Sequence, residues 1–222
     1  MKKLLMYFFI LMLANSINAQ HTGFYAGLNG ALQLSLIFNS DDHDKGGELN
    51  YETTIKQAFG LDLGYKFNPK VGVQTGIIYS QQGQKYITTG NPNANYRTDL
   101  TYIKFPVLFS YHLRADKEIS FFVQAGLQLS LLTEAKSSRL NVFGIYSPAY
   151  KDVKDYYSSL PIEVALGCGV QYSLRKFCIN VLIRPDLSIS DIEKTETKPG
   201  LRSPTNNFTL GLPQLGFHYF FN

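Results

Sequence analysis

Apolar and polar residues alternate with a period of two along most of the chain from residue 23 to the C-terminus. This period is typical of β-strands, because successive side chains of a strand point to opposite faces. In the segment LTYIKFPVLFSYHL, residues 100–113, one face is wholly apolar, whereas the other carries Lys104, Pro106 and His112. The alternation predicts eight strands, at residues 23–36, 54–67, 71–86, 98–112, 119–134, 157–173, 176–190 and 207–221.

The connections between these strands alternate between long and short. The long, polar ones are residues 37–53, 87–97, 135–156 and 191–206, and the short ones are residues 68–70, 114–118 and 173–175. Outer-membrane barrels have this asymmetry, with long external loops and short periplasmic turns. The pattern predicts an all-β fold: a single eight-stranded antiparallel up-and-down transmembrane β-barrel with both termini in the periplasm.

The two faces of the predicted strands differ in the same way in every strand. One carries large apolar residues, such as Phe59, Leu61 and Leu63, and the other carries glycine, serine, glutamine and a few charges. The interior of an eight-stranded barrel is barely wide enough for side chains, so the small and polar set suits the lumen. A Lys or Arg turned toward lipid at the midplane costs about 2–4 kcal/mol, and the apolar set is almost free of charge. The alternative is a secreted soluble barrel with the apolar set inside, which would bind a small hydrophobic ligand.

The N-terminus has the layout of a secretory signal peptide. Lys2 and Lys3 precede an apolar run, residues 4–13, and Ala19 stands at the predicted cleavage site. The run is shorter than the roughly 20 residues that a spanning helix needs. We therefore predict a signal peptide at residues 1–19 and an outer-membrane β-barrel domain at residues 20–222.

Composition agrees with export to a membrane rather than with nucleic-acid binding. Charged residues make up 17% of the chain, against roughly 25% in ordinary soluble domains, and aromatic residues make up 14%. The net charge of +4 is too small to indicate a nucleic-acid partner. We expect the mature protein in the outer membrane, in contact with its lipid.

Prolines and cysteines give tests of the strand assignment. Pro106 lies in the middle of a predicted strand, and the apolar parity of the last strand switches at Pro213. Proline lacks a ladder donor, so we expect a β-bulge at each position. Cys168 shares the lipid-facing parity and Cys178 the lumenal parity, so the register predicts two free thiols rather than a disulfide.

Charged residues of both signs have lumenal parity. They are Asp62, Lys66, Lys104, Glu163, Arg184 and Asp186. Isolated charges in so confined a space would be costly, so we expect a polar network of ion pairs that plugs the barrel. A proton or ion path is the alternative. His112 and His218 have the same parity near the periplasmic end, and two histidines are too few for a zinc site.

Outside the lumen, the candidate chemistry is sparse. Asp41, Asp42, His43 and Asp44 in the first long loop could bind a divalent cation, but the distant Glu of a calcium loop is missing and a solvated loop is the simpler interpretation. No catalytic or phosphate-binding motif occurs. We expect no cofactor, no metal and no enzymatic activity. A lipid-modifying enzyme would need a histidine on the external side, where only His43 lies.

Three segments carry a family resemblance: FGLDLGYKFNPKVGVQTGIIYSQQGQKY, TYIKFPVLFSYHL and FFVQAGLQLSLLTEAK. Together they resemble the PorT-type outer-membrane β-barrel family of the Gram-negative phylum Bacteroidota. The ending LGFHYFFN is similar to the aromatic terminal strand that barrel-assembly machinery recognises. The resemblance implies envelope or secretion-system partners. The family's strand motif has an acidic residue where this chain has Lys104.

These observations predict a non-enzymatic integral outer-membrane protein with a structural or interaction role for its external loops, and a secretion-system accessory is one such role. The alternatives are a porin-like narrow pore or transport accessory, and the secreted soluble barrel described above.

Overall fold

The computed structural model describes residues 21–43, 49–88, 95–139, 151–198 and 202–221. The predicted signal peptide lies outside these residues and stays a prediction. Eight long strands form the barrel: β1 (Gly23–Asn39), β3 (Thr54–Lys66), β4 (Val71–Thr88), β5 (Tyr96–Leu113), β6 (Ile119–Arg139), β8 (Ile162–Leu174), β9 (Phe177–Ser188) and β10 (Thr205–Phe220). The short elements are α2 (Ser40–His43), β2 (Leu49–Glu52), β7 (Lys151–Asp152) and two 3₁₀ turns, η3 (Lys154–Tyr156) and η4 (Thr195–Thr197).

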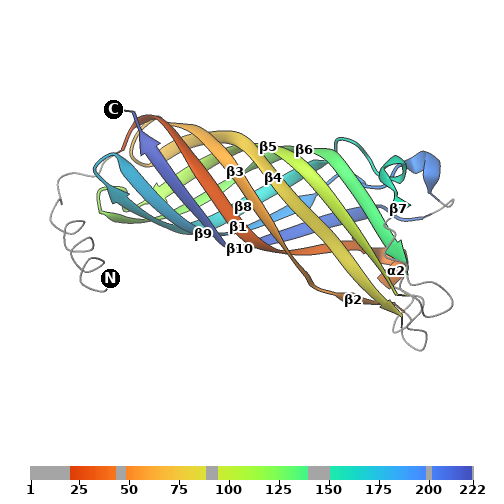
Figure 1. Ribbon diagram of the computed structural model, residues 1–222. Coiled ribbons are helices and arrows are strands. Elements are labelled where there is room, and N and C mark those ends of the chain that lie inside the picture. Colours follow the sequence, from red (N-terminus) through yellow and green to blue (C-terminus); the bar gives the residue numbers. More distant parts are fainter. Residues whose placement is uncertain (1–20, 44–48, 89–94, 140–150, 199–201, 222) are drawn as a thin grey trace.

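Antiparallel pairing joins each long strand to the next, and β10 closes the ring on β1. The closing ladder runs from Tyr25 opposite Phe220 to Asn39 opposite Thr205. The strands are tilted around the barrel. The first residue of β1 and the last residue of β10 lie at the same end of it (Figure 1). The eight-stranded antiparallel barrel predicted from the alternation is therefore confirmed. In the described part of the chain, no helix combines the length and apolar character that a membrane crossing requires.

The faces of the strands also agree with the prediction. The apolar set points outward: Leu61 is 58% exposed and Phe109 is 63% exposed. The polar set points inward: Lys104 and Glu163 are each 1% exposed. A barrel with its apolar set inside would show the reverse. This arrangement rules out the secreted soluble barrel, because its surface would have to expose a continuous band of large apolar side chains to water.

Several strand boundaries differ from the prediction, and the largest differences are in β6 and β8. The strand β6 continues to Arg139 rather than ending at residue 134, and β8 begins at Ile162 rather than at residue 157. Residues 154–156, in the predicted loop, form η3, and Tyr157 makes an isolated bridge to Glu193 in the loop between β9 and β10. Pro161 immediately precedes β8, and a proline cannot donate to a ladder, so the pairing starts after it.

The bulge predicted at Pro106 is wrong. Pro106 stands opposite Gln128 in a ladder whose register is continuous from Tyr102 to Leu113. The ladder between β5 and β4 also has the same register before and after Pro106. The Thr75 hydroxyl donates to the Pro106 carbonyl over 2.8 Å. This bond gives the Pro106 carbonyl a partner, and the strand passes the proline without an extra residue. The irregularity in β5 and β6 lies between Thr101 and Tyr102 instead.

The bulge predicted near Pro213 is confirmed. The register of β10 shifts between Gly211 and Gln214 against β9, and the same part of β10 is out of register with β1. The cysteine prediction is also confirmed. Cys178 is buried opposite Ser173, Cys168 is exposed on the outer wall, and both thiols are free.

Candidate functional site

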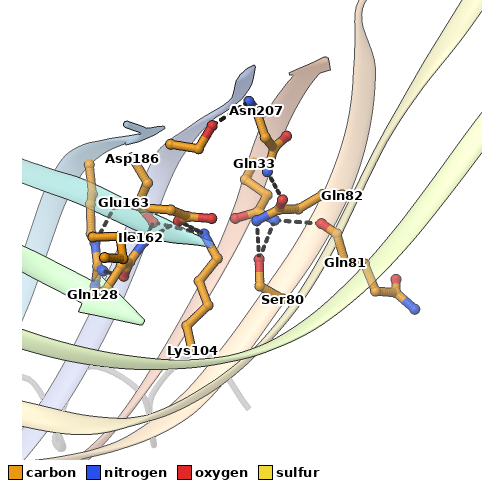
Figure 2. Close-up of polar contacts among 12 residues, drawn as sticks. Gln33, Ser80, Gln81, Gln82, Lys104, Gln128, Ile162, Glu163, Asp186 and Asn207 are labelled. Carbon is orange, nitrogen blue, oxygen red and sulfur yellow. Dashed lines mark hydrogen bonds and ion pairs between the residues drawn. The ribbon is translucent and has the colours of Figure 1, made fainter. Parts of the chain in front are cut away.

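The centre of the lumen holds a hydrogen-bonded network of five buried side chains, called the central network below: Lys104, Gln128, Glu163, Arg184 and Asp186. The Lys104 ammonium donates to Glu163 Oε2 over 2.8 Å and to Asp186 Oδ2 over 3.2 Å. Arg184 Nε donates to Asp186 Oδ1 over 2.9 Å. Figure 2 shows Lys104 reaching across the lumen toward Glu163 and Asp186.

Gln128 completes the central network as a bridge. Its amide nitrogen donates to Glu163 Oε2 over 2.5 Å and to Asp186 Oδ2 over 2.8 Å. Its carbonyl oxygen accepts from an Arg184 terminal nitrogen over 2.6 Å. Two cations and two carboxylates therefore balance one another, as buried charges must if their desolvation is to be offset. The amide makes the set one network rather than two pairs.

Strand register explains why these five residues meet. Gln128 stands directly opposite Glu163 on β8 and opposite Pro106 on β5. Asp186 stands opposite Ala165, two positions from Glu163 on the same face of β8. Residues of equal parity in adjacent antiparallel strands share a face, so four neighbouring strands deliver the network to one level of the lumen.

Asp62 belongs to a separate group nearer the periplasmic end. Its carboxylate accepts from the Asn29 amide over 2.7 Å and lies 3.0 Å from His218 Nε2. The other ring nitrogen of His218 lies 3.2 Å from the Asn180 amide. The six residues of the sequence-predicted network are all buried, but they lie in separate groups, and His218 is hydrogen-bonded within the group of Asp62.

Lys66 forms a third, smaller group at the end of β3. Its ammonium donates to Gln171 Oε1 over 3.3 Å and lies 5.8 Å from the centre of the Phe220 ring. Nearby, His112 stacks on Phe122 with ring centres 5.2 Å apart. Neither basic side chain has a carboxylate within ion-pair distance among the described residues.

An apolar cluster, called the mouth cluster below, lies at the extracellular end of the barrel. It consists of Ile37, Leu100, Tyr102, Leu132, Ala135 and Ile192, with Val153 and Tyr157 packed against it. Three strands contribute to it, and so do both of the loops that follow β6 and β9. Burial raises the pKa of the Tyr157 hydroxyl to about 12. The two loops are therefore folded onto the barrel mouth.

The periplasmic end of the lumen is filled by aromatic side chains. Tyr25 and Phe220 pack with Cys178, and the two rings lie 5.1 Å apart. His21 stacks on Phe220 with ring centres 4.3 Å apart. Within the lumen, a cavity of about 20 Å³ adjoins Lys104 and other polar side chains, which is room for about one water molecule.

The acidic cluster of the first loop is only partly described. The carboxylate of Asp41 accepts from the Ser203 amide over 2.6 Å and from its hydroxyl over 2.8 Å. These bonds hold the pKa of Asp41 below its usual value. The side chains of Asp42 and His43, and all of Asp44, lie outside the described residues. In the part of the chain that is described, no group of three or more His, Cys, Asp or Glu side chains has the arrangement of a metal site.

Two features of the site were not predicted from the sequence. Gln128 has the right parity and an uncharged side chain, so a search for charges overlooks it. The mouth cluster depends on Ile192, which lies in a loop and follows no strand period. The only signal for the cluster is that Leu100 and Leu132 are apolar at lumenal positions.

A closed barrel with an apolar outer band and a polar, filled lumen defines an integral outer-membrane β-barrel protein. The chain belongs to the outer membrane protein beta-barrel domain family, whose model matches residues 14–193. The protein is accordingly placed in the outer membrane. No curated protein sequence matches the chain.

Solved structures of outer-membrane proteins are similar to this chain at low sequence identity. The outer membrane protein OprG from Pseudomonas aeruginosa is 14% identical, with a TM-score of 0.50 over 93% of this chain and 100% of that one. Neisserial surface protein A is 13% identical, with a TM-score of 0.48 over 90% and 98%. The attachment invasion locus protein Ail of Yersinia pestis is 15% identical, with a TM-score of 0.44 over 90% and 100%.

Proposed function

We propose that this protein is a closed, non-enzymatic outer-membrane barrel that presents an ordered extracellular rim to a protein partner in the cell envelope. The observation that carries the proposal is the mouth cluster. Ile192 is fully buried although it lies in a loop, so burial of apolar surface fixes the loop after β9 against the strands. Loops that are already ordered lose less conformational entropy when they bind a partner.

Polar contacts support the same role for the rim. Asp191 accepts from the backbone amides of Glu193 and Thr205 and also contacts the Lys198 ammonium. Asp41 ties α2 to the same loop through Ser203. These carboxylates hold the loops in place. On the surface of this rim, Tyr156 is 49% exposed and Leu160 is 51% exposed, which gives a partner apolar surface to bury.

The filled lumen favours this role over a narrow pore. The central network, the mouth cluster and the periplasmic aromatic side chains occupy three successive levels of the lumen. An ion crossing the barrel would have to displace all three. A barrel of eight strands has little interior to spare for such a movement.

The partner class is the one that the PorT-type resemblance implies, an envelope or secretion-system protein. Biogenesis would use the barrel-assembly machinery, with the aromatic last strand as its signal. The rim exposes positive and negative side chains together, as in the pairs Lys85 with Glu52 and Lys136 with Glu134. Such a mixed surface suits a protein partner better than a polyanion.

Two measurements test the proposal. A photo-crosslinking amino acid at Tyr156 should give discrete crosslinked protein bands in whole cells, whereas the same amino acid at the lipid-facing Phe217 should not. In planar bilayers, the purified barrel should give no channel currents. Steady single-channel currents together with an absence of crosslinks from position 156 would support the transport alternative instead.

A further inference from the structure

The wall of the barrel has a seam at its extracellular end. The ladder between β1 and β3 ends at the pair Ser35 and Thr54, but β1 continues to Asn39. The segment that precedes β3 forms β2, which pairs with β4. In the described ladders, the last four residues of β1 pair with β10 alone. Figure 1 shows α2 and β2 at this same end.

Side chains of β1 and β4 satisfy backbone groups of the other strand along the seam. Gln84 Oε1 accepts from the Ile37 amide over 3.3 Å, and the Tyr86 hydroxyl donates to the Ile37 carbonyl over 3.4 Å. The Ser35 hydroxyl accepts from the Gly83 amide over 2.9 Å. Lipid supplies no partner for free backbone groups, so this replacement for the ladder lets the seam meet the membrane boundary.

A pocket of about 530 Å³ lies on the outer side of this seam, within the size range of small-molecule sites. Leu36, Phe38, Tyr51 and Pro204 give it a largely apolar lining. Asn39, Ser40 and Asn206 add polar groups to its wall. The pocket therefore combines a long apolar surface with hydrogen-bonding groups.

The pocket opens toward the lipid-facing wall of the barrel. Leu36 and Phe38 have the same parity as Leu28 and Leu32, which are 59% and 60% exposed on the lipid-facing wall. The pocket is thus continuous with the membrane-facing surface, at the end of the barrel opposite the termini. A membrane lipid could enter from this surface with its chains in the apolar band and its head toward the loops.

We propose that the seam pocket binds one acyl chain of an outer-leaflet membrane lipid, with the polar head of that lipid at Ser40 and Asn206. Phe38 and Tyr51 would line the two sides of the chain. The wall around the site is fixed in advance, because the Asn39 amide donates to the Ser203 carbonyl over 2.6 Å and to the Thr205 hydroxyl over 2.9 Å. This role goes beyond the proposed protein partner and does not depend on it.

Fluorescence quenching provides a test, because the chain contains no tryptophan. Tyr51→Trp places a single emitter in the pocket, and Phe217→Trp places one on the lipid-facing wall of β10 as a control. Each variant, folded in detergent, is titrated with a phospholipid that has brominated acyl chains. We expect the emission of the pocket variant to fall in a saturable step complete near one lipid per protein. The emission of the wall variant should instead follow the lipid content of the micelles without saturating.

A blocking variant and a second measurement make the result decisive. Phe38→Glu in the Tyr51→Trp background should abolish the saturable step, because the carboxylate would be desolvated by the chain. Native mass spectrometry should find one retained lipid on the wild-type protein and none on Phe38→Glu. If the pocket and wall variants respond alike, or if the pocket variant is not quenched because a protein segment fills the pocket, the proposal is wrong. Saturation by a brominated free fatty acid but not by the phospholipid would also overturn it.

Discussion

Lys104 Nζ lies 2.8 Å from Glu163 Oε2 across the barrel lumen, although the two residues are 59 positions apart in the sequence. Both side chains are nearly inaccessible to solvent. The attraction between the two charges offsets part of the cost of burying them, and the pair links β5 to β8 through the interior in addition to the ladders of the wall.

The first prediction concerns this pair. Glu163→Gln should lower the free energy of unfolding by about 3 kcal/mol, at the lower end of the range for breaking a buried ion pair, because Lys104 keeps Asp186 as a partner. Urea unfolding of the protein in lipid vesicles measures the change. Glu134→Gln is the matched control: its pair with Lys136 is on the surface, so it should cost less than about 1 kcal/mol.

A double-mutant cycle separates the pair from the packing of its members. With Lys104→Met added to Glu163→Gln, the remaining Arg184 and Asp186 charges balance, so the double variant should be more stable than the sum of the two single losses predicts. Strict additivity would show that Lys104 and Glu163 are not energetically coupled, and no loss from Glu163→Gln alone would show that the buried pair does not stabilise the barrel.

The second prediction concerns the two thiols. In detergent, an apolar maleimide should label one cysteine per folded chain, because Cys168 is exposed on the outer wall and Cys178 is fully buried in the lumen. After unfolding, two should react. Intact-mass spectrometry counts the labels, and Cys168→Ser should leave the folded protein unlabelled. Labelling of the folded Cys168→Ser protein would contradict the assigned register.

The third prediction concerns the mouth cluster. Ile192→Ala should detach the loop between β9 and β10, because truncating a fully buried isoleucine removes about 2–5 kcal/mol of packing. The barrel ladders do not include this residue, so global unfolding should change little. Limited proteolysis of intact cells should then cut the loop much faster than in the wild type. Leu160→Ala, at a residue that is 51% exposed, is the control and should leave the cleavage rate unchanged.

The fourth prediction concerns pH. Burial alone would raise the pKa of Asp191, but the Lys198 ammonium and the backbone amides of Glu193 and Thr205 together hold it below its usual 3.8. A lowered folded-state pKa stabilises the loop above the unfolded value, and this contribution is lost as the pH falls through the folded value. The Thr205 amide should therefore keep constant protection from hydrogen exchange between about pH 7 and 5 and lose it below about pH 4.

A matched variant checks the origin of that pH dependence. Asp191→Asn should show reduced protection of the Thr205 amide at neutral pH and no further drop on acidification. The amide of Gly216, within the β10 ladder, should stay protected throughout. Equal losses at both amides would indicate general acid unfolding rather than titration of Asp191.

The two-residue period of the sequence determined the number of strands, their antiparallel order and the faces that meet lipid and lumen. It could do so because the bilayer imposes one chemistry on the outside of every strand and the narrow interior another. The same logic placed Cys168 and Cys178 on opposite faces and located the bulge at Pro213, where the parity visibly switches.

Only the tertiary structure decided which lumenal residues touch. Parity assigns a face, whereas the level of a side chain along the barrel axis depends on the stagger between strands. This is why Lys104, Glu163, Arg184 and Asp186 meet around Gln128, while Asp62 and Lys66 lie in separate groups. Pro106 keeps the register of both ladders, and its carbonyl accepts from the hydroxyl of Thr75 on the neighbouring strand, a contact that its own sequence neighbourhood does not reveal. The mouth cluster and the seam arise where loops return to the strands, beyond the reach of any periodic pattern.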